Sequence, residues 1–420
     1  MLNPGVKRRE VFGWAMYDFA NSGYTTVVIT AVFAAYFVGA VADQAEWATL
    51  AWTSALSVSY AIVMLTMPAL GEWADRHAAK KKMLMAFTAA LAWVGPGQVA
   101  LALVCIVISN TFFSYGESLT AAFLPELATS DAMGRVSAWG WAWGYLGGML
   151  SLGICLAYVL WAQGQGQTAG QFVPVTMLVT ALIYALAACV SFALIKEHAK
   201  PQTSRERSKS QWQQLRQTFQ EAKAYKDFMQ LMACAVAYQG GVAVAITLAA
   251  IYAEQVIGFQ PQETMVLIFV LNIAALVGAL VFGYVQDRIG HKLALAITLV
   301  GWSITCVLAA LTTSKEVFWW AAALAGVCMG SSQSTGRAMA GLFIPSHRLA
   351  EFFGLWTFAI RLASIVGPLG YGLITWVTAG NQRLAIGATA VLFLVGLALL
   401  LPINVMRGQS KAQAPASTTA

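Results

Sequence analysis

Long apolar segments, separated by short polar ones, recur along the whole chain. Six lie in each half, at about 12–42, 48–70, 83–97, 99–124, 136–162, 173–195, 228–257, 264–285, 292–312, 317–342, 352–378 and 383–405. A helix of about 20 mostly apolar residues crosses a bilayer. The pattern therefore predicts an all-α membrane protein with twelve transmembrane helices.

Composition and charge agree with this interpretation and indicate the topology. Hydrophobic residues make up 59% of the chain and charged residues only 10%, against about 25% charged residues in soluble domains. Lysine and arginine gather on one side of the predicted spans: Lys7, Arg8, Arg9, Arg76, 80–82, Arg135, 196–226, Arg288, Lys292, Arg348, Arg407 and Lys411, with Lys315 and Arg383 on the other. Because basic loops stay in the cytoplasm, we expect a multi-pass protein of the cytoplasmic (inner) membrane with both termini cytoplasmic. Topology thus accounts for the net charge of +7, and no nucleic acid partner is expected.

Polar segments divide the chain into domains. We expect a six-helix bundle over 1–196, a cytoplasmic linker over 197–227, a second six-helix bundle over 228–406 and a disordered tail over 407–420. In the linker, Trp212, Leu215, Phe219 and Ala222 follow helical spacing, which suits an amphipathic helix on the inner leaflet. A plain connector is the simpler alternative. The first apolar run is too long for a signal peptide, so no cleaved segment is expected.

Two pairs of motifs indicate that the halves are repeats of one design. GEWADRHAAKKK at 71–82 and GYVQDRIGHK at 283–292 both read Gly, three further residues, Asp-Arg and a basic patch, at an offset of 212. GESLTAAFLP at 116–125 matches GRAMAGLFIP at 336–345 at an offset of 220, which also aligns Gly147 with Gly367. A duplicated six-span bundle is the architecture of transporters that move two halves about a central site.

The repeated loops resemble the signature of the major facilitator superfamily, and the resemblance extends over the whole chain. YDFANS (17–22), AFLPELA (122–128), GWAWGYLGG (140–148) and AEFFGLW (350–356) resemble more narrowly the vacuole effluxer branch, whose effluxer releases amino acids, and its bacterial relatives. The resemblance implies the major facilitator fold, with two pseudo-symmetric six-helix bundles and a cavity lined by spans one, four, seven and ten. The chain departs from the pattern twice. Ala78 replaces a glycine of the first loop, although Gly290 is present in the second, and YQGGVAVA (238–245) lacks the acid expected in span seven.

Few ionisable residues lie well inside the predicted spans, so each is a functional candidate. A charge at the bilayer centre costs about 2.5–3.5 kcal/mol on insertion scales, and such residues usually face the bundle interior. They are Asp18, Glu117, Arg337 and Arg361, of which Glu117 and Arg337 are repeat equivalents of opposite charge. Helical spacing adds Asn21, Ser22 and Thr25 to Asp18, Asn110 and Ser114 to Glu117, and Gly330 and Ser334 to Arg337. We expect these three stripes to line one aqueous cavity.

The types of these residues suggest roles toward a solute and a proton. Arg337 and Arg361 suit an anionic group such as a carboxylate. Asp18 and Glu117 suit an amine or the coupling proton, because burial raises the pKa of a carboxyl group. Additional hydrogen-bonding candidates are Gln239, Gln333 and Asn272. The plainer alternative is that Glu117 and Arg337 neutralise each other and that the amides only join helices.

The repeated loops are candidates for gating. Their residues are Gly71, Asp75 and Arg76 in the first half and Gly283, Asp287 and Arg288 in the second, and the available acidic partners are Glu126, Asp131 and Glu351. A loop aspartate can cap the positive end of a neighbouring helix, and the adjacent arginine can pair with an acid. The resemblance implies a network that latches the outward-open state. A basic anchor with no gating role is the alternative.

Other classes of function lack their motifs. The chain has no GxxxxGK[ST] phosphate loop, and its four histidines lie in predicted loops, so neither ATP hydrolysis nor an intramembrane enzyme is expected. The six cysteines lie singly in apolar runs, as core residues do, and no metal or other cofactor is expected. We therefore predict a monomeric secondary transporter that moves a small polar solute, such as an amino acid, by alternating access coupled to protons. The alternatives are proton-driven efflux of drugs or metabolites, and a membrane sensor or scaffold that transports nothing.

Overall fold

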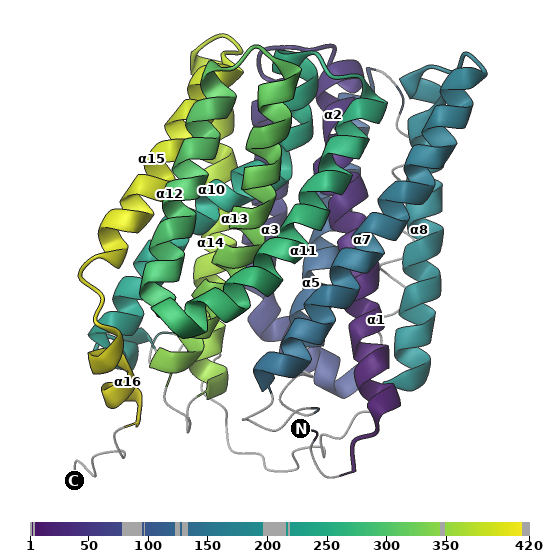
Figure 1. Ribbon diagram of the computed structural model, residues 1–420. Coiled ribbons are helices and arrows are strands. Elements are labelled where there is room, and N and C mark those ends of the chain that lie inside the picture. Colours follow the sequence, from purple (N-terminus) through teal and green to yellow (C-terminus); the bar gives the residue numbers. More distant parts are fainter. Residues whose placement is uncertain are drawn as a thin grey trace. The chain divides into compact units, whose positions relative to one another are not determined.

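The computed structural model describes residues 2, 5–77, 95, 97–121, 127, 133–195, 216, 219–344 and 349–413. Its elements are α-helices, with three π-helical segments named η (Figure 1). In chain order they are α1 (Arg8–Tyr24), η1 (Thr25–Ala31), α2 (Phe33–Tyr36), η2 (Phe37–Val41), α3 (Ala48–His77), α5 (Val99–Ala121), α7 (Met133–Gly164), α8 (Ala169–Leu194), α10 (Lys226–Tyr252), η4 (Ala253–Ile257), α11 (Pro261–Ile289), α12 (His291–Leu311), α13 (Lys315–Phe343), α14 (Leu349–Val377), α15 (Gln382–Leu400) and α16 (Val405–Gln413).

The helices agree with the predicted spans. Within the described residues, ten helices are long and apolar enough to cross a membrane. The tenth predicted span is α13, a helix of 29 residues that is not among those ten, because its segment 331–337 is polar. The third predicted span, 83–97, lies almost entirely outside the described residues, so ten of the twelve spans are found by length and hydropathy together.

The chain forms two compact units. Unit 1 consists of Met1–Ser204, Ile246–Ile273 and Gly372–Gln382, and unit 2 of Arg205–Ala245, Ala274–Tyr371 and Arg383–Ala420. Unit 1 thus combines the first predicted bundle with two segments of the second. Hydrogen bonds join both segments to the first bundle. From segment Gly372–Gln382, Gln382 Nε2 donates to Thr49 Oγ1 of the first bundle at 2.9 Å. In segment Ile246–Ile273, Gln262 Oε1 accepts from Gln163 Nε2 of the first bundle at 3.0 Å.

In unit 1, α1 packs between α7 and α8, and glycine makes the approach to α7 possible. A Cβ atom added to Gly147 would overlap the carbonyl oxygen of Phe19. Unit 2 repeats this contact between α10 and α14, where a Cβ added to Gly367 would overlap the carbonyl oxygen of Gly240. Small residues let helix backbones approach closely in membranes. The offsets of 220 and 221 between these residues confirm that the halves repeat one packing design.

The first helix of each repeat changes its winding toward its far end. In the first repeat α1 passes into η1 at Thr25, three residues beyond the end of the YDFANS motif (17–22), and the span ends in η2. In the second repeat α10 ends in η4, followed by Gly258 at a φ of +76°. Single π-helical turns inside α-helices are frequent at functional sites. In the first span the change of winding therefore lies beside the polar motif, and in the second repeat it lies at the end of the equivalent span.

The C-terminal segment differs from its prediction. The sequence predicts disorder over 407–420, whereas the structure forms α16 as far as Gln413. The Asn404 side chain caps this helix, because its Oδ1 accepts the Arg407 N–H at 3.0 Å, and the Arg407 side chain pairs with Asp227 of α10. That partner is remote in sequence, so the polar composition of the tail does not reveal it. Residues 414–420 lie outside the described part of the chain.

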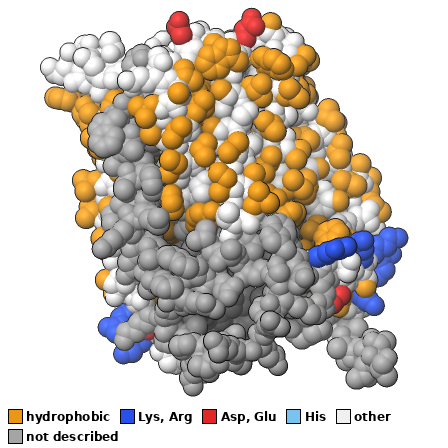
Figure 2. All heavy atoms as spheres, turned by 180° about the vertical axis from the view of Figure 1, so that it is seen from behind, with side chains coloured by type: hydrophobic (Ala, Val, Ile, Leu, Met, Phe, Trp, Pro, Cys, Tyr) orange, Lys and Arg blue, Asp and Glu red, His pale blue; other side chains and the backbone are white. Residues whose placement is uncertain are grey.

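The described surface is apolar over the long helices. Hydrophobic side chains cover them in Figure 2, and lysine and arginine side chains appear toward the lower end of that view. Among the cysteines, which are all free, four are buried, Cys105 is partly buried and Cys189 is exposed. Trp52 is fully buried against Phe33 and Phe37, so it is a core residue, although its position near a span end suggests an interfacial anchor.

Candidate substrate-translocation site

In unit 1, a tyrosine of α1 lies over a glycine of α5, directly beside a predicted charged site. A Cβ added to Gly116 would overlap the Tyr17 hydroxyl, so a larger residue would displace the phenol ring. The next residue, Glu117, is half-buried and acts electrostatically on Tyr184 of α8. The rings of Tyr17 and Tyr184 meet edge to face at 6.3 Å between centroids.

Asn21 extends this cluster on α1. Its Oδ1 accepts the Tyr184 hydroxyl at 2.8 Å, and the residue is only 6% exposed. Its amide nitrogen, also buried, has no hydrogen-bond acceptor among the described residues. A buried donor without an acceptor costs about 1–3 kcal/mol. This amide is therefore a group that a bound solute or water would satisfy.

Unit 2 repeats the arrangement with the opposite charge. A Cβ added to Gly336 of α13 would overlap the Tyr238 hydroxyl of α10. The next residue, Arg337, is half-buried and acts electrostatically on Tyr238. Gln239 Nε2 donates to the Tyr238 hydroxyl at 3.4 Å. Each unit thus holds a charged residue beside a glycine that a tyrosine covers.

The residues of the polar stripe of α1 contact two different helices, α7 and α8. Asp18, Ser22 and Thr25 are half-buried, whereas Asn21 turns to α8. Asp18 lies against α7, because a Cβ added to Gly140 would be 2.5 Å from its Oδ2. Helical spacing alone predicts that the four residues share one environment. In the structure they face two different helices.

In each of the other two stripes, and at Asn272, a candidate residue already makes a contact within the helices. Asn110 Nδ2 donates to Ser59 Oγ of α3, so Asn110 is a buried contact between α5 and α3. Gly330 packs against α11, where an added Cβ would overlap the Ala275 carbonyl oxygen. Asn272 donates to the Ile268 carbonyl of its own helix, at 2.8 Å. Spacing shows which residues share a face of a helix, but not which helix covers that face.

The remaining candidates fall on helices of both units. Gln333, Ser334 and Arg337 of α13 and Arg361 of α14 are half-buried in unit 2. Gln239 is 9% exposed there. Unit 1 holds Asp18, Asn21 and Glu117. That the two sets line one shared cavity stays a prediction.

The gating candidates lie on helices where the sequence predicts loops. Both helices continue past the end of their apolar runs. The last turns of α3 therefore include Gly71, Asp75 and Arg76, and the last turns of α11 include Gly283, Asp287 and Arg288. Gly290 then ends the second segment at a φ of +88°, a backbone conformation that favours glycine. Glu351 lies in α14, while Glu126 and Asp131 lie outside the described residues. The gating network stays a prediction.

Sequence reasoning missed several polar and aromatic residues. It assigned no role to Tyr17, Tyr184 and Tyr238, although Tyr17 and Tyr238 recur at an offset of 221 and that recurrence is a detectable signal. It also passed over Glu254, which lies half-buried in η4. Gln382 was missed as well, and its side chain donates to both Thr49 and Gln255.

Comparisons with known proteins bear on the family and the fold of the chain. A family model described as vacuole effluxer Atg22 like matches residues 48–413. The chain is 27% identical over 405 residues to an uncharacterized MFS-type transporter, YxiO, of Bacillus subtilis (strain 168), covering 92% of this chain and 93% of that protein. It is 26% identical over 218 residues to autophagy-related protein 22-1 of Penicillium rubens (strain ATCC 28089 / DSM 1075 / NRRL 1951 / Wisconsin 54-1255), covering 48% and 36%. A crystal structure of a bacterial homolog to the human lysosomal transporter Spinster superposes with a TM-score of 0.70 at 13% identity, covering 98% of this chain and 100% of that one, which shows the same fold.

Proposed function

The chain belongs to the Atg22-like vacuole effluxer family of MFS-type secondary transporters, and we propose that it moves a small zwitterionic solute, such as an amino acid, by alternating access. It is a multi-pass integral membrane protein with the MFS fold, and its family consists of transporters rather than enzymes. The solute, the coupling ion and the cytoplasmic position of both termini are parts of the proposal.

One observation carries the choice of solute. Glu117 and Arg337 occupy equivalent positions of the two repeats, each half-buried and each next to a glycine that a tyrosine hydroxyl covers. An amino acid presents an ammonium and a carboxylate. A glutamate accepts charge-assisted hydrogen bonds from an ammonium, and the fork of an arginine matches a carboxylate. We assign Glu117 to the ammonium and Arg337 to the carboxylate.

Asp18 is the proposed proton carrier. It is a half-buried carboxylate within a membrane-spanning helix, and ionisable residues in such positions mark ion and proton pathways. Its carboxylate lies against Gly140 of α7, so a change of its charge acts directly on the packing of α1 and α7. Coupling to protons follows if protonation of Asp18 alters this contact.

Counterflow in proteoliposomes tests the assignment. Labelled amino acids are exchanged by the wild type, by Glu117→Gln and by Arg337→Lys, with Glu316→Gln and Arg9→Lys as controls that make the same two changes at exposed positions. We expect both site variants to lose at least about tenfold in exchange, a free-energy difference of about 1.4 kcal/mol. Arg337→Lys retains charge but lacks the planar fork.

Each outcome distinguishes a class of function. Site variants that exchange as fast as the controls would refute the two assignments. A wild type that exchanges no amino acid but exports drugs or metabolites against a proton gradient would support the efflux alternative. A wild type that transports neither amino acids nor drugs or metabolites would favour a sensor or scaffold.

A further inference from the structure

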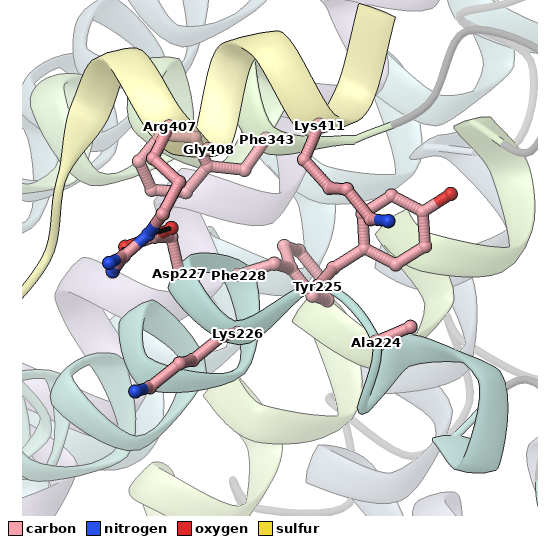
Figure 3. Close-up of a pocket in the computed structure, with 9 residues that line it drawn as sticks. All are labelled: Ala224, Tyr225, Lys226, Asp227, Phe228, Phe343, Arg407, Gly408 and Lys411. Carbon is pink, nitrogen blue, oxygen red and sulfur yellow. Dashed lines mark hydrogen bonds and ion pairs between the residues drawn. The ribbon is translucent and has the colours of Figure 1, made fainter. Parts of the chain in front are cut away.

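A small cationic cavity lies at the end of unit 2 where α10 begins and α13 ends (Figure 3). Its volume is about 170 Å³, below the ~300–1,000 Å³ of pockets for drug-sized ligands. Tyr225, Phe228 and Phe343 supply aromatic walls, and Lys226, Arg407 and Lys411 supply positive charge. A cavity of this size and composition fits a compact anionic group beside apolar surface.

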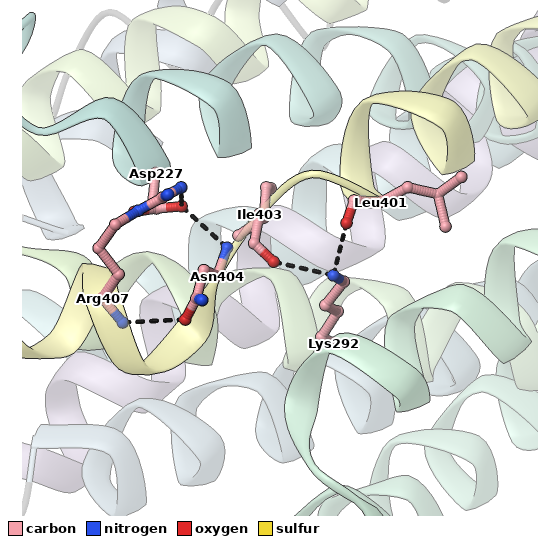
Figure 4. A network of polar contacts seen from close by, with 6 residues as sticks. All are labelled: Asp227, Lys292, Leu401, Ile403, Asn404 and Arg407. Atoms are coloured by element: carbon pink, nitrogen blue, oxygen red, sulfur yellow. Dashed lines mark hydrogen bonds and ion pairs between the residues drawn. The ribbon is translucent and has the colours of Figure 1, made fainter.

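The acid that lines the cavity is already engaged. Asp227 Oδ1 accepts hydrogen bonds from Arg407 Nη2 at 2.7 Å and from the Asn404 N–H at 2.8 Å, and its Oδ2 accepts one from Arg407 Nε at 2.7 Å (Figure 4). This hydrogen-bonded pairing raises the pKa of the Arg407 guanidinium, which stays charged. Three lining cations against one lining carboxylate leave a surplus of two positive charges, carried by the exposed Lys226 and Lys411.

The frame of the cavity is fixed by packing and by helix capping. Lys292 Nζ donates to the carbonyl oxygens of Leu401 at 2.6 Å and Ile403 at 2.8 Å, which satisfies acceptors in the turn that follows α15. Gly408 lets α16 approach α13, because an added Cβ would be 2.6 Å from Phe343 Cδ1. In Figure 3, Lys411 reaches from α16 toward Tyr225.

The cavity lies at the level where the membrane-spanning helices stop. α10 begins at Lys226, α13 ends at Phe343 and α15 ends at Leu400. In the segment that follows α15 and begins α16, Leu401 is 65% exposed and Met406 is 79% exposed. In a bilayer, exposed apolar side chains at this level meet acyl chains, while the lysines meet the headgroup layer.

We propose that this cavity binds the phosphate headgroup of an anionic phospholipid. Basic pockets between helices on the cytoplasmic side bind such headgroups, and the positive-inside rule assigns this end to that side. The bound lipid would hold α16 against unit 2 and anchor it in the leaflet. The inference is independent of the transported solute.

Lipid retention by the purified full-length protein tests the proposal. The protein in neutral detergent is mixed with phosphatidylglycerol or with phosphatidylcholine of the same acyl chains, and bound lipid is counted by native mass spectrometry. We expect one retained phosphatidylglycerol on the wild type and at least a tenfold loss in the double variant Lys226→Gln, Lys411→Gln. The matched control, Lys223→Gln with Lys315→Gln, removes the same charge from exposed sites outside the cavity and should retain the lipid.

Two further arms exclude other sources of the signal. Inorganic phosphate should not displace phosphatidylglycerol when it is added at up to about 10 mM. This concentration is roughly a tenth of the 0.1 M ionic strength at which the Debye length falls to about 10 Å. Displacement would assign the cavity to a soluble anion. On the unaltered protein, retention should fall as NaCl is raised, because exposed charges are screened. Retention that is insensitive to salt, or equal in the double variant and its control, would overturn the proposal.

Discussion

A close approach of two helix backbones in unit 2 gives a sharp test of the repeat packing. A Cβ added to Gly367 would be 2.5 Å from the carbonyl carbon and 2.7 Å from the Cα of Gly240, whereas carbon atoms pack best at about 3.5–4.0 Å. Backbone atoms have no rotamer that relieves the overlap, so Gly367→Ala must separate α10 from α14 by roughly 1 Å. Overpacking of this kind costs about 1–3 kcal/mol.

The same helix supplies the control. An added Cβ at Gly370 meets no atom within 4 Å, and alanine is more favourable than glycine in a helix by about 1 kcal/mol. We therefore expect Gly370→Ala to be neutral or stabilising, and the two variants to differ by about 2–4 kcal/mol. The repeat offers a second pair, in which Gly147→Ala should destabilise and Gly153→Ala, whose nearest atom is 3.8 Å away, should not.

Buried cysteines provide the readout. Cys155, Cys234, Cys306 and Cys328 are buried, so a thiol-reactive dye labels them only on unfolding. A Cys105→Ser, Cys189→Ser background removes the partly buried and the exposed thiol. The midpoint temperature should be lowest for Gly367→Ala and Gly147→Ala. If Gly367→Ala unfolds at the same temperature as Gly370→Ala, the helices are not in backbone contact, and the repeat packing described here is refuted.

Two further predictions concern single polar contacts. Asn404→Ala removes the N-cap of α16 and should cost about 0.5–2 kcal/mol locally; hydrogen exchange over Val405–Gln413 should become faster than in Gln409→Ala, and equal rates would contradict the cap. Gln163→Cys with Gln262→Cys, in a Cys189→Ser background, places one thiol at each of the two positions whose amide side chains now bond at 3.0 Å. A short bis-maleimide crosslinker, which alkylates both thiols, should then arrest counterflow if this contact opens during transport, and undiminished exchange would show that it does not.

Apolar run length and repeat offset predict most of the architecture. The runs predict the helices because a bilayer demands long apolar segments regardless of their neighbours. The offset of 220 pairs Gly116 with Gly336 and Gly147 with Gly367, and each pair makes the same kind of contact in its unit. Repetition in the sequence therefore carries tertiary information that no single segment contains.

The candidate site was predicted less completely, because periodicity assigns a face and not a neighbour. Asn110 and Glu117 share a helical face, yet Asn110 bonds to Ser59 of α3 while Glu117 acts on Tyr184 of α8. The tail shows the same limit. A polar segment becomes helical because Asp227, which is remote in the chain, accepts the Arg407 side chain.

Symmetry of the backbone and asymmetry of the side chains together point to a mechanism. Glycine contacts and tyrosine-covered glycines recur in both units, so the scaffold is the same on both sides. At the adjacent positions the chemistry differs: Asp18 corresponds to Gln239, and Glu117 corresponds to Arg337. If these residues only joined helices, neutral pairs would suffice and would avoid the cost of intramembrane charge. Opposite charges on an otherwise repeated frame suit a solute with two unlike ends, and they support the proposal of a zwitterion over that of a hydrophobic drug.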